Sequence, residues 1–208
     1  MRLSTPKTWQ VCAALALALA CWTVIFGLKL VNFWLGMALA ASGLALLSVF
    51  WAGFPLNRSE LNLKNTMLGL ASALLLYGIF GLGRYISLAL LPFASEQIGS
   101  IYTIERQAER LIIALVLLFI TSPAEEIFWR GFLQRWSVKR FGSAKGLLLA
   151  SFCYAAVHMT SGNFMLMGAA LTAGLFWGWM YLRTGSLYAC MLSHAVWTVG
   201  IFLLFPMP

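Results

Sequence analysis

Long apolar runs separated by short polar stretches recur along the whole chain, and this pattern predicts membrane-spanning helices. Seven runs can be drawn, with ends that are good to a few residues. They cover residues 8–27, 31–53, 66–92, a stretch from about 110 to the Glu125–Glu126 pair, 146–159, 164–182 and 187–205. A helix needs about 20 apolar residues to cross the hydrocarbon core of a bilayer. We therefore expect an all-α, polytopic membrane helical bundle of about seven to eight transmembrane helices.

The polar stretches leave two parts of the chain open to more than one interpretation. Residues 93–109 hold three of the six acids and predict either a loop or a helix at the membrane interface. The fourth run either continues through Pro123 or breaks there, and in the second case residues 122–140 form a further or a re-entrant membrane segment. We find no internal repeat, linker or low-complexity stretch, so we expect residues 1–208 to form a single integral membrane domain.

Composition supports a membrane protein and argues against a soluble one. Hydrophobic residues make up 62% of the chain and charged residues 10%, and the mean hydropathy is +0.87. A soluble domain has about 25% charged residues. The formal net charge of +8 would suit a nucleic-acid partner, but the basic residues lie at the ends of the apolar runs rather than on one face. We therefore expect the lipid bilayer, and no nucleic acid, as the partner of this charge.

The distribution of lysine and arginine predicts how the chain is oriented. If the seven runs cross the membrane alternately, nine basic residues lie on the side of the N-terminus and three on the other side. The nine are Arg2, Lys7, Arg58, Lys64, Arg135, Lys139, Arg140, Lys145 and Arg183, and the three are Lys29, Arg106 and Arg110. Because basic residues concentrate on the cytoplasmic side, we expect an integral protein of the cytoplasmic (inner) membrane with a cytoplasmic N-terminus.

One short polar stretch places two carboxylates next to a long apolar run. A structural interpretation makes Ser122 a helix N-cap, Pro123 the first helical residue and Glu125 the acid of a capping box. Glu126 and Arg130 are then an ion pair one helical turn apart. The other interpretation is functional, because carboxylates near membrane depth are costly to keep charged unless they have partners or a chemical role.

His158 and His194 are the only two histidines in the chain, and both lie inside later apolar runs. Together with the glutamate pair they predict a polar cavity shared by three helices, whose chemistry is the activation of water. Arg130 pairs with Glu126, so Glu125, which lies about 100° further round the helix, is the candidate general base. In this interpretation His158 orients or activates the water, and His194 stabilises an oxyanion.

Two questions about this site stay open at the level of the sequence. Glu125, His158 and His194 are an acceptable zinc ligand set, although no HExxH pair is present, so a metal-free and a zinc-dependent site both fit the spacing. The leading interpretation requires no cofactor. The predicted runs also place the glutamate pair at the cytoplasmic end of one run and His158 toward the far end of the next. A shared site therefore requires different ends for these runs, or residues 122–140 inside the membrane.

Three short motifs resemble those of the CPBP family, the intramembrane proteases that include CAAX prenyl endopeptidases and bacteriocin-processing or self-immunity (Abi-type) proteins. Glu125-Glu-Ile-Phe-Trp-Arg130 resembles the EExxxR motif, His158 matches the histidine of FxxxH, and His194 matches that of HxxxN or HxxxD. The resemblance spans about residues 108–205. It implies an all-helical endopeptidase with a cavity open to the cytoplasmic side and with Glu125 as the base for water.

Two positions depart from the family pattern. Tyr154 stands where the second motif has Phe, and it adds a hydroxyl group. Thr198 stands where the third motif has Asn or Asp, and a threonine hydroxyl can bond to a carbonyl of its own helix. Because threonine offers neither an amide donor nor a carboxylate, this position favours a catalytically weakened member of the family.

The leading hypothesis is an endopeptidase that uses glutamate- and histidine-activated water to cleave a membrane-associated protein or peptide, which the resemblance extends to lipidated, CAAX-like substrates. Its predicted site residues are Glu125, Glu126, Arg130, His158, His194 and Thr198. A second hypothesis is a membrane binding, immunity or scaffold protein without activity. A third is a transporter or proton relay, against which we find no inverted repeat and no paired broken helices.

Overall fold

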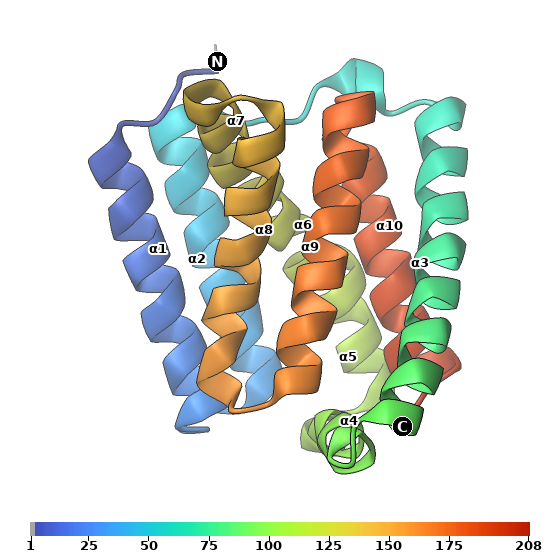
Figure 1. Cartoon of the computed structure of the whole chain (residues 1–208). Helices are drawn as coiled ribbons and strands as arrows, with labels where there is room; N and C mark the ends of the chain where they lie inside the picture. The colour runs from blue at the N-terminus through green and yellow to red at the C-terminus, as the bar shows by residue number, and fades with distance from the viewer. Residues whose placement is uncertain (1–2) are drawn as a thin grey trace.

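A computed structural model describes residues 3–208, and every regular element in this part of the chain is helical (Figure 1). The α-helices are α1 (Thr8–Trp22), α2 (Phe33–Ala52), α3 (Leu63–Leu90), α4 (Ala94–Tyr102), α5 (Arg110–Val116), α6 (Ser122–Glu126), α7 (Arg135–Phe141), α8 (Ser143–His158), α9 (Phe164–Thr184) and α10 (Leu187–Val199). Wider π-helical turns extend or join them at Thr23–Gly27, Leu117–Thr121, Ile127–Gln134 and Gly200–Leu204. Short 3₁₀ turns lie at Arg58–Glu60, Thr103–Gln107 and Met159–Ser161.

Six of the described helices or helix runs are long and apolar enough to cross a membrane. The run Arg110–Phe141 counts as one of them and is the longest, with 32 residues. Helix α8 has only 16 residues, but it lies alongside α9 in the bundle and packs against it (Figure 1). The predicted all-α, polytopic bundle is therefore confirmed. The predicted runs match the helices to within a few residues, except for the fourth, whose helix continues to Phe141.

Helices α5, α6 and α7 belong to one continuous helix, so the fourth apolar run continues through Pro123. Proline has no N–H to donate and its ring crowds the preceding turn, and π-helical turns directly before and after α6 make room for it. The predicted helix start and capping box are wrong, because Ser122 has helical backbone angles (φ −62°, ψ −46°) and its hydroxyl caps no backbone group. Residues 122–140 are the second half of this helix, which places the Glu125–Glu126 pair near its middle.

The two ends of the bundle differ in the charged residues that they carry. We call one end the basic end; it holds the start of α1 and the junctions between α2 and α3, α7 and α8, and α9 and α10. The basic residues there are Lys7, Arg58, Lys64, Arg135, Lys139, Arg140, Lys145 and Arg183, while Arg2 lies outside the described residues. The opposite end, which we call the α4 end, carries Lys29, Arg106 and Arg110 together with Glu96, Glu105 and Glu109. Helix α4 lies across this end, as expected of an interfacial helix (Figure 1).

Helices α7 and α8 pack so closely at Gly146 that a side chain there has no room. A Cβ atom added to Gly146 would lie 2.5 Å from the backbone N and Cα atoms of Val138. We predict that Gly146→Ala lowers the free energy of unfolding by about 1–3 kcal/mol, the usual cost of overpacking. Gly168→Ala on α9 is the matched control, because no atom lies within 4 Å of its added Cβ. Thermal unfolding of the two variants, purified in detergent, measures their stability. Equal melting temperatures for Gly146→Ala and Gly168→Ala would contradict the close packing at Gly146.

Candidate active site

Glu126 lies at the centre of a buried ionic cluster that joins three helices. Its Oε1 atom accepts one hydrogen bond from Arg130 Nη1 and one from His194 Nδ1, each at 2.8 Å. Arg130 Nη2 also donates to the carbonyl oxygens of Ala173 and Gly174 on α9, each at 3.4 Å. Glu126 is fully buried and Arg130 is 2% exposed, so water does not screen their interaction. The predicted ion pair is therefore present, and it also orients His194.

Aromatic rings hold this cluster in place. The Arg130 guanidinium lies 5.1 Å from the ring centroid of Tyr154 and 5.4 Å from that of Trp177. Trp177 also stacks on the imidazole of His194, with ring centroids 4.0 Å apart. Because the Nδ1 atom of His194 is bound to Glu126, Nε2 is the ring nitrogen left for a ligand. No local pattern in the sequence distinguishes Trp177 from the other aromatic residues of the membrane helices, so sequence reasoning missed it.

Glu125 is buried beside this cluster but is not bonded to Arg130, as its position round the helix predicts. Its Oε2 atom accepts a hydrogen bond at 3.0 Å from the hydroxyl of Tyr154 on α8. The substitution that sets Tyr154 apart from the family pattern thus supplies a donor that holds the Glu125 carboxylate. The opposite oxygen, Oε1, has no hydrogen bond within the described chain.

His158 lies at the end of α8, and both of its ring nitrogens are engaged. Its Nδ1 atom lies 2.8 Å from the carbonyl oxygen of Tyr154, one turn back, and donates to it. Its Nε2 atom accepts a hydrogen bond from Trp22 Nε1 at 3.2 Å. This arrangement leaves the ring no free nitrogen with which to activate water. Trp22 comes from α1, outside the motif-bearing half of the chain, so the sequence contained no signal for it.

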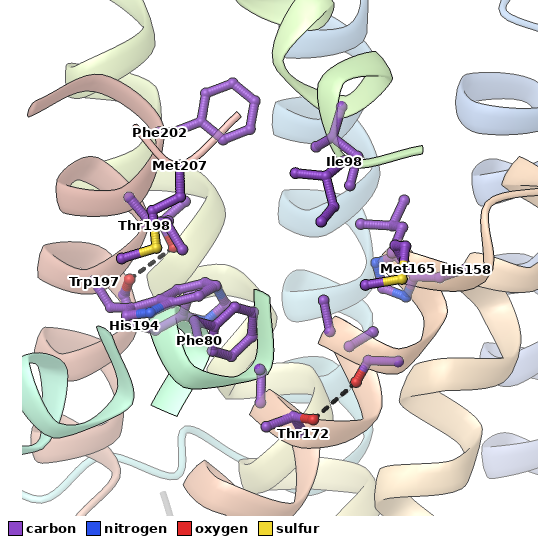
Figure 2. A pocket seen from close by; sticks show the side chains of 18 of the residues that line it. Phe80, Ile98, His158, Met165, Thr172, His194, Trp197, Thr198, Phe202 and Met207 are labelled. Carbon is purple, nitrogen blue, oxygen red and sulfur yellow. Dashed lines mark hydrogen bonds between the residues drawn. The ribbon is translucent and has the colours of Figure 1, made fainter. Parts of the chain in front are cut away.

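The residues present do not fit the zinc ligand set that the spacing allowed. Figure 2 shows His158 and His194 on opposite walls of the pocket. Among residues 3–208, no three His, Cys, Asp or Glu side chains are grouped so that they could hold a metal ion. Binding zinc through Glu125, His158 and His194 would also require the bond from Trp22 to His158 to break. We therefore derive no catalytic step through a metal.

Thr198 bonds to its own helix, as the sequence suggested. Its hydroxyl donates to the carbonyl oxygen of His194 at 2.8 Å, so it is not a free donor for a substrate (Figure 2). Three other buried donors have no partner within the described chain and line the same cavity, namely the hydroxyls of Thr121 and Ser122 and the indole N–H of Trp197. Sequence reasoning did not single out these three groups. They are available to bind a water molecule or a substrate carbonyl.

These side chains border a cavity of about 540 Å³. Four of the six predicted site residues line it, namely Glu125, His158, His194 and Thr198, whereas Glu126 and Arg130 lie behind the wall. Tyr154 lines it as well. The other walls come from α4, from the turn Thr23–Gly27, from the start of α2 and from the halves of α3, α9 and α10 that lie toward the α4 end. The structure therefore brings the predicted residues together, and the cavity extends toward the α4 end.

This position corrects one combination of expectations. The charge pattern predicts a cytoplasmic basic end, and the family resemblance implies a cavity open to the cytoplasm. Because the cavity extends toward the end opposite the basic one, the two expectations exclude each other. The structure also removes the predicted separation of Glu125 from His158. The helix that carries the glutamate pair is longer than predicted, so the pair lies near the middle of the bundle rather than at its cytoplasmic end.

The motif-bearing half of the chain also matches a known family. Residues 107–200 match the family model described as Type II CAAX prenyl endopeptidase Rce1-like. The match includes all the predicted site residues, from Glu125 to Thr198. Comparisons with curated proteins and with solved structures gave no match. The match over residues 107–200 therefore supports a protease of the CPBP family, similar to the Rce1-like CAAX prenyl endopeptidases.

Proposed function

We propose that the protein is an intramembrane endopeptidase in which Glu125 activates a water molecule. The observation that supports this best is the environment of Glu125, whose buried carboxylate borders the cavity and is held on one oxygen by Tyr154. The other oxygen is available to bind water and take its proton. Glu126 lies behind the wall of the cavity, where its Oε1 atom is bound to Arg130 and His194, so it does not face a water molecule in the cavity.

In the proposed reaction, Glu125 removes a proton from water, and the hydroxide attacks the carbonyl carbon of the scissile peptide bond. The carbon–nitrogen bond then breaks while the protonated Glu125 returns its proton to the leaving nitrogen, so atoms and charge balance. His194 Nε2 donates to the oxyanion. It does so with a proton on both ring nitrogens, and the carboxylate of Glu126, bonded to Nδ1, stabilises that charge.

The remaining predicted residues position these groups. Arg130 holds the Glu126 carboxylate through a hydrogen bond, and His158 fixes the wall of the cavity through its bonds to Trp22 and to the Tyr154 carbonyl. Thr198 cannot supply the side-chain donor that Asn would provide, because its hydroxyl is bonded to its own helix. We propose that Ser122 or Trp197, whose donors are unpartnered at the cavity, supports the oxyanion instead. No cofactor is required for these steps.

The cavity suits a hydrophobic substrate. Its walls include Phe26, Phe33, Phe80, Phe164 and Trp34, with few polar groups beyond those named above. We propose a membrane-associated protein or peptide as the substrate, and a lipidated, CAAX-like segment as the candidate at the level of the family. An apolar wall of this kind gains free energy by removing a lipid chain or apolar side chains from water.

The experiment that tests this proposal is cleavage of a membrane-peptide library by the purified protein in detergent or proteoliposomes. Each peptide is supplied with and without a prenyl group, and each reaction is run with and without a chelator. We expect cleavage of hydrophobic peptides that a chelator does not inhibit, since no step uses a metal. Loss of cleavage with the chelator and its return on adding zinc would overturn the metal-free mechanism.

We also propose that the basic end lies in the cytoplasm, as expected for a protein of the cytoplasmic membrane. The cavity then lies in the outer half of the bilayer. Ser143 at the basic end and Ser95 on α4 are both exposed and suit a labelling test. In intact cells, a membrane-impermeant maleimide should label Ser95→Cys but not Ser143→Cys, relative to the background of the native cysteines. The opposite pattern would place the cavity in the cytoplasmic half.

A second function is favoured by one observation, the internal hydrogen bond of Thr198. If catalysis needs the side-chain donor that Asn would provide at position 198, the protein lacks protease activity. It is then a membrane binding, immunity or scaffold protein that keeps the fold. Thr198→Asn discriminates the two functions in the same library assay. Cleavage by the wild type supports the enzyme, whereas a silent wild type together with an active Thr198→Asn variant would identify a protein that has lost its activity.

A further inference from the structure

The segment Phe205–Pro208 is bound at the edge of the cavity by side chains from α3 and α4. It is not helical, and it follows the last π-helical turn of α10. The hydroxyl of Tyr77 donates to the Phe205 carbonyl oxygen at 2.9 Å, and the Met207 N–H donates to the hydroxyl of Tyr102 at 2.9 Å. Arg84 donates to the Pro208 carbonyl oxygen through Nε at 3.1 Å and also through Nη2.

All of these hydrogen bonds go to the backbone of the segment, and they therefore do not depend on its side chains. Arg84 and Tyr102 also line the cavity, so these groups lie on the boundary of the candidate active site. Tyr102 is held in turn by a bond from its hydroxyl to the Ile201 carbonyl oxygen at 3.1 Å. Side chains that bind the backbone of a non-helical segment in this way would bind other peptides of the same shape.

The side chain of Met207 extends into the cavity. It is one of the lining residues, and Figure 2 shows it on the wall that carries Thr198 and Trp197. Gly81 on α3 leaves room for it, since a Cβ atom added there would lie 3.5 Å from the Met207 methyl group and 3.9 Å from its sulfur. An apolar side chain in a pocket, flanked by backbone hydrogen bonds, is how an extended peptide is held with both affinity and selectivity.

We propose that Tyr77, Arg84 and Tyr102 form a peptide-binding subsite at the cavity mouth, and that Phe205–Pro208 occupies it as an internal ligand that a substrate displaces. The inference rests on the proposed function in one respect, namely that the peptide that displaces this segment is a substrate. The expected ligand is an extended peptide that places an unbranched or small apolar side chain in the space of Met207. Because this segment is joined to α10 by a short stretch of chain, it competes with a substrate at a high effective concentration, of about millimolar order. The protein without bound substrate is therefore partly inhibited by its own segment.

The test uses a fluorescent peptide that repeats residues 203–208 and the full chain with Glu125→Gln, so that bound peptide is not cleaved. In this background, Met207→Asp should release the internal segment, because a carboxylate is disfavoured in the apolar cavity. Fluorescence polarisation should then show peptide binding at least about tenfold tighter than in the parent, a gain set by the lost competition. Met207→Leu is the matched control and should bind the peptide as weakly as the parent.

A second set of variants tests the subsite itself. In the Met207→Asp chain, Tyr102→Phe or Arg84→Gln should weaken peptide binding several-fold, because each removes a donor or acceptor for the peptide backbone. Tyr85→Phe, on the exposed face of α3, should leave binding unchanged. Equal binding by the parent and by Met207→Asp, or no loss in Tyr102→Phe and Arg84→Gln, would overturn the inference. Because binding is read without cleavage, these outcomes are independent of whether the library assay finds protease activity.

Discussion

Glu125→Gln is expected to abolish peptide cleavage without unfolding the protein. Glutamine has the same shape and can still accept the hydrogen bond from Tyr154, so the buried network around it is kept. Its amide cannot take a proton from water, and the loss of a general base lowers the rate by about 10²–10⁴-fold. The measurement is kcat/KM on a library-selected peptide, together with the melting temperature of each preparation. An unchanged melting temperature with activity at background would support Glu125 as the base.

The matched control for this substitution lies directly before the same helix run. Glu109 directly precedes α5 and is exposed, so Glu109→Gln changes the same chemical group away from the cavity. It should cleave like the wild type. If Glu125→Gln still cleaves, another group must be the general base, and His194 is the next candidate. If Glu125→Gln instead changes the flux of a solute or of protons into vesicles, and no peptide is cleaved, the result supports the transporter hypothesis.

Arg130→Met is expected to have the largest effect on stability. Arg130 and Glu126 are both buried, and removing the guanidinium leaves a carboxylate inside the bundle without its cationic partner. Breaking one side of a buried ion pair typically costs about 3–5 kcal/mol. We therefore expect a much lower yield of folded protein and a melting temperature many degrees below that of the wild type. Arg140→Met, at an exposed position of α7, should behave like the wild type.

The double variant Glu126→Gln with Arg130→Met separates the buried charge from the shape of the site. It removes both members of the pair, so no unpaired carboxylate remains. Its melting temperature should recover a substantial part of what Arg130→Met loses, because replacing both partners of a buried pair costs less than removing one. A double variant that is less stable than Arg130→Met would show that hydrogen bonds to α9 and His194 matter more than the charge. The same double-mutant cycle measures the coupling between the two side chains.

The membrane helices could be predicted from the sequence because apolar runs and helical spacing act over a few residues. Pro123 shows the limit of such local reasoning. A proline after a serine is typical of a helix start, yet here π-helical turns on both sides let the helix continue. Only packing against the rest of the bundle makes a continuous helix of 32 residues the better solution. The shared site depended on that outcome, since it places the glutamate pair at mid-bundle.

Within the site, the sequence by itself determined the contacts made one helical turn apart. The Glu126–Arg130 pair and the bond from Thr198 to the His194 carbonyl follow from helical geometry alone. The tertiary structure decided the contacts between helices. Tyr154 meets Glu125 across 29 positions of sequence, and Trp22 meets His158 across 136. It also decided that the cavity extends toward the α4 end. Such contacts depend on how distant helices pack, and no local pattern of residues encodes them.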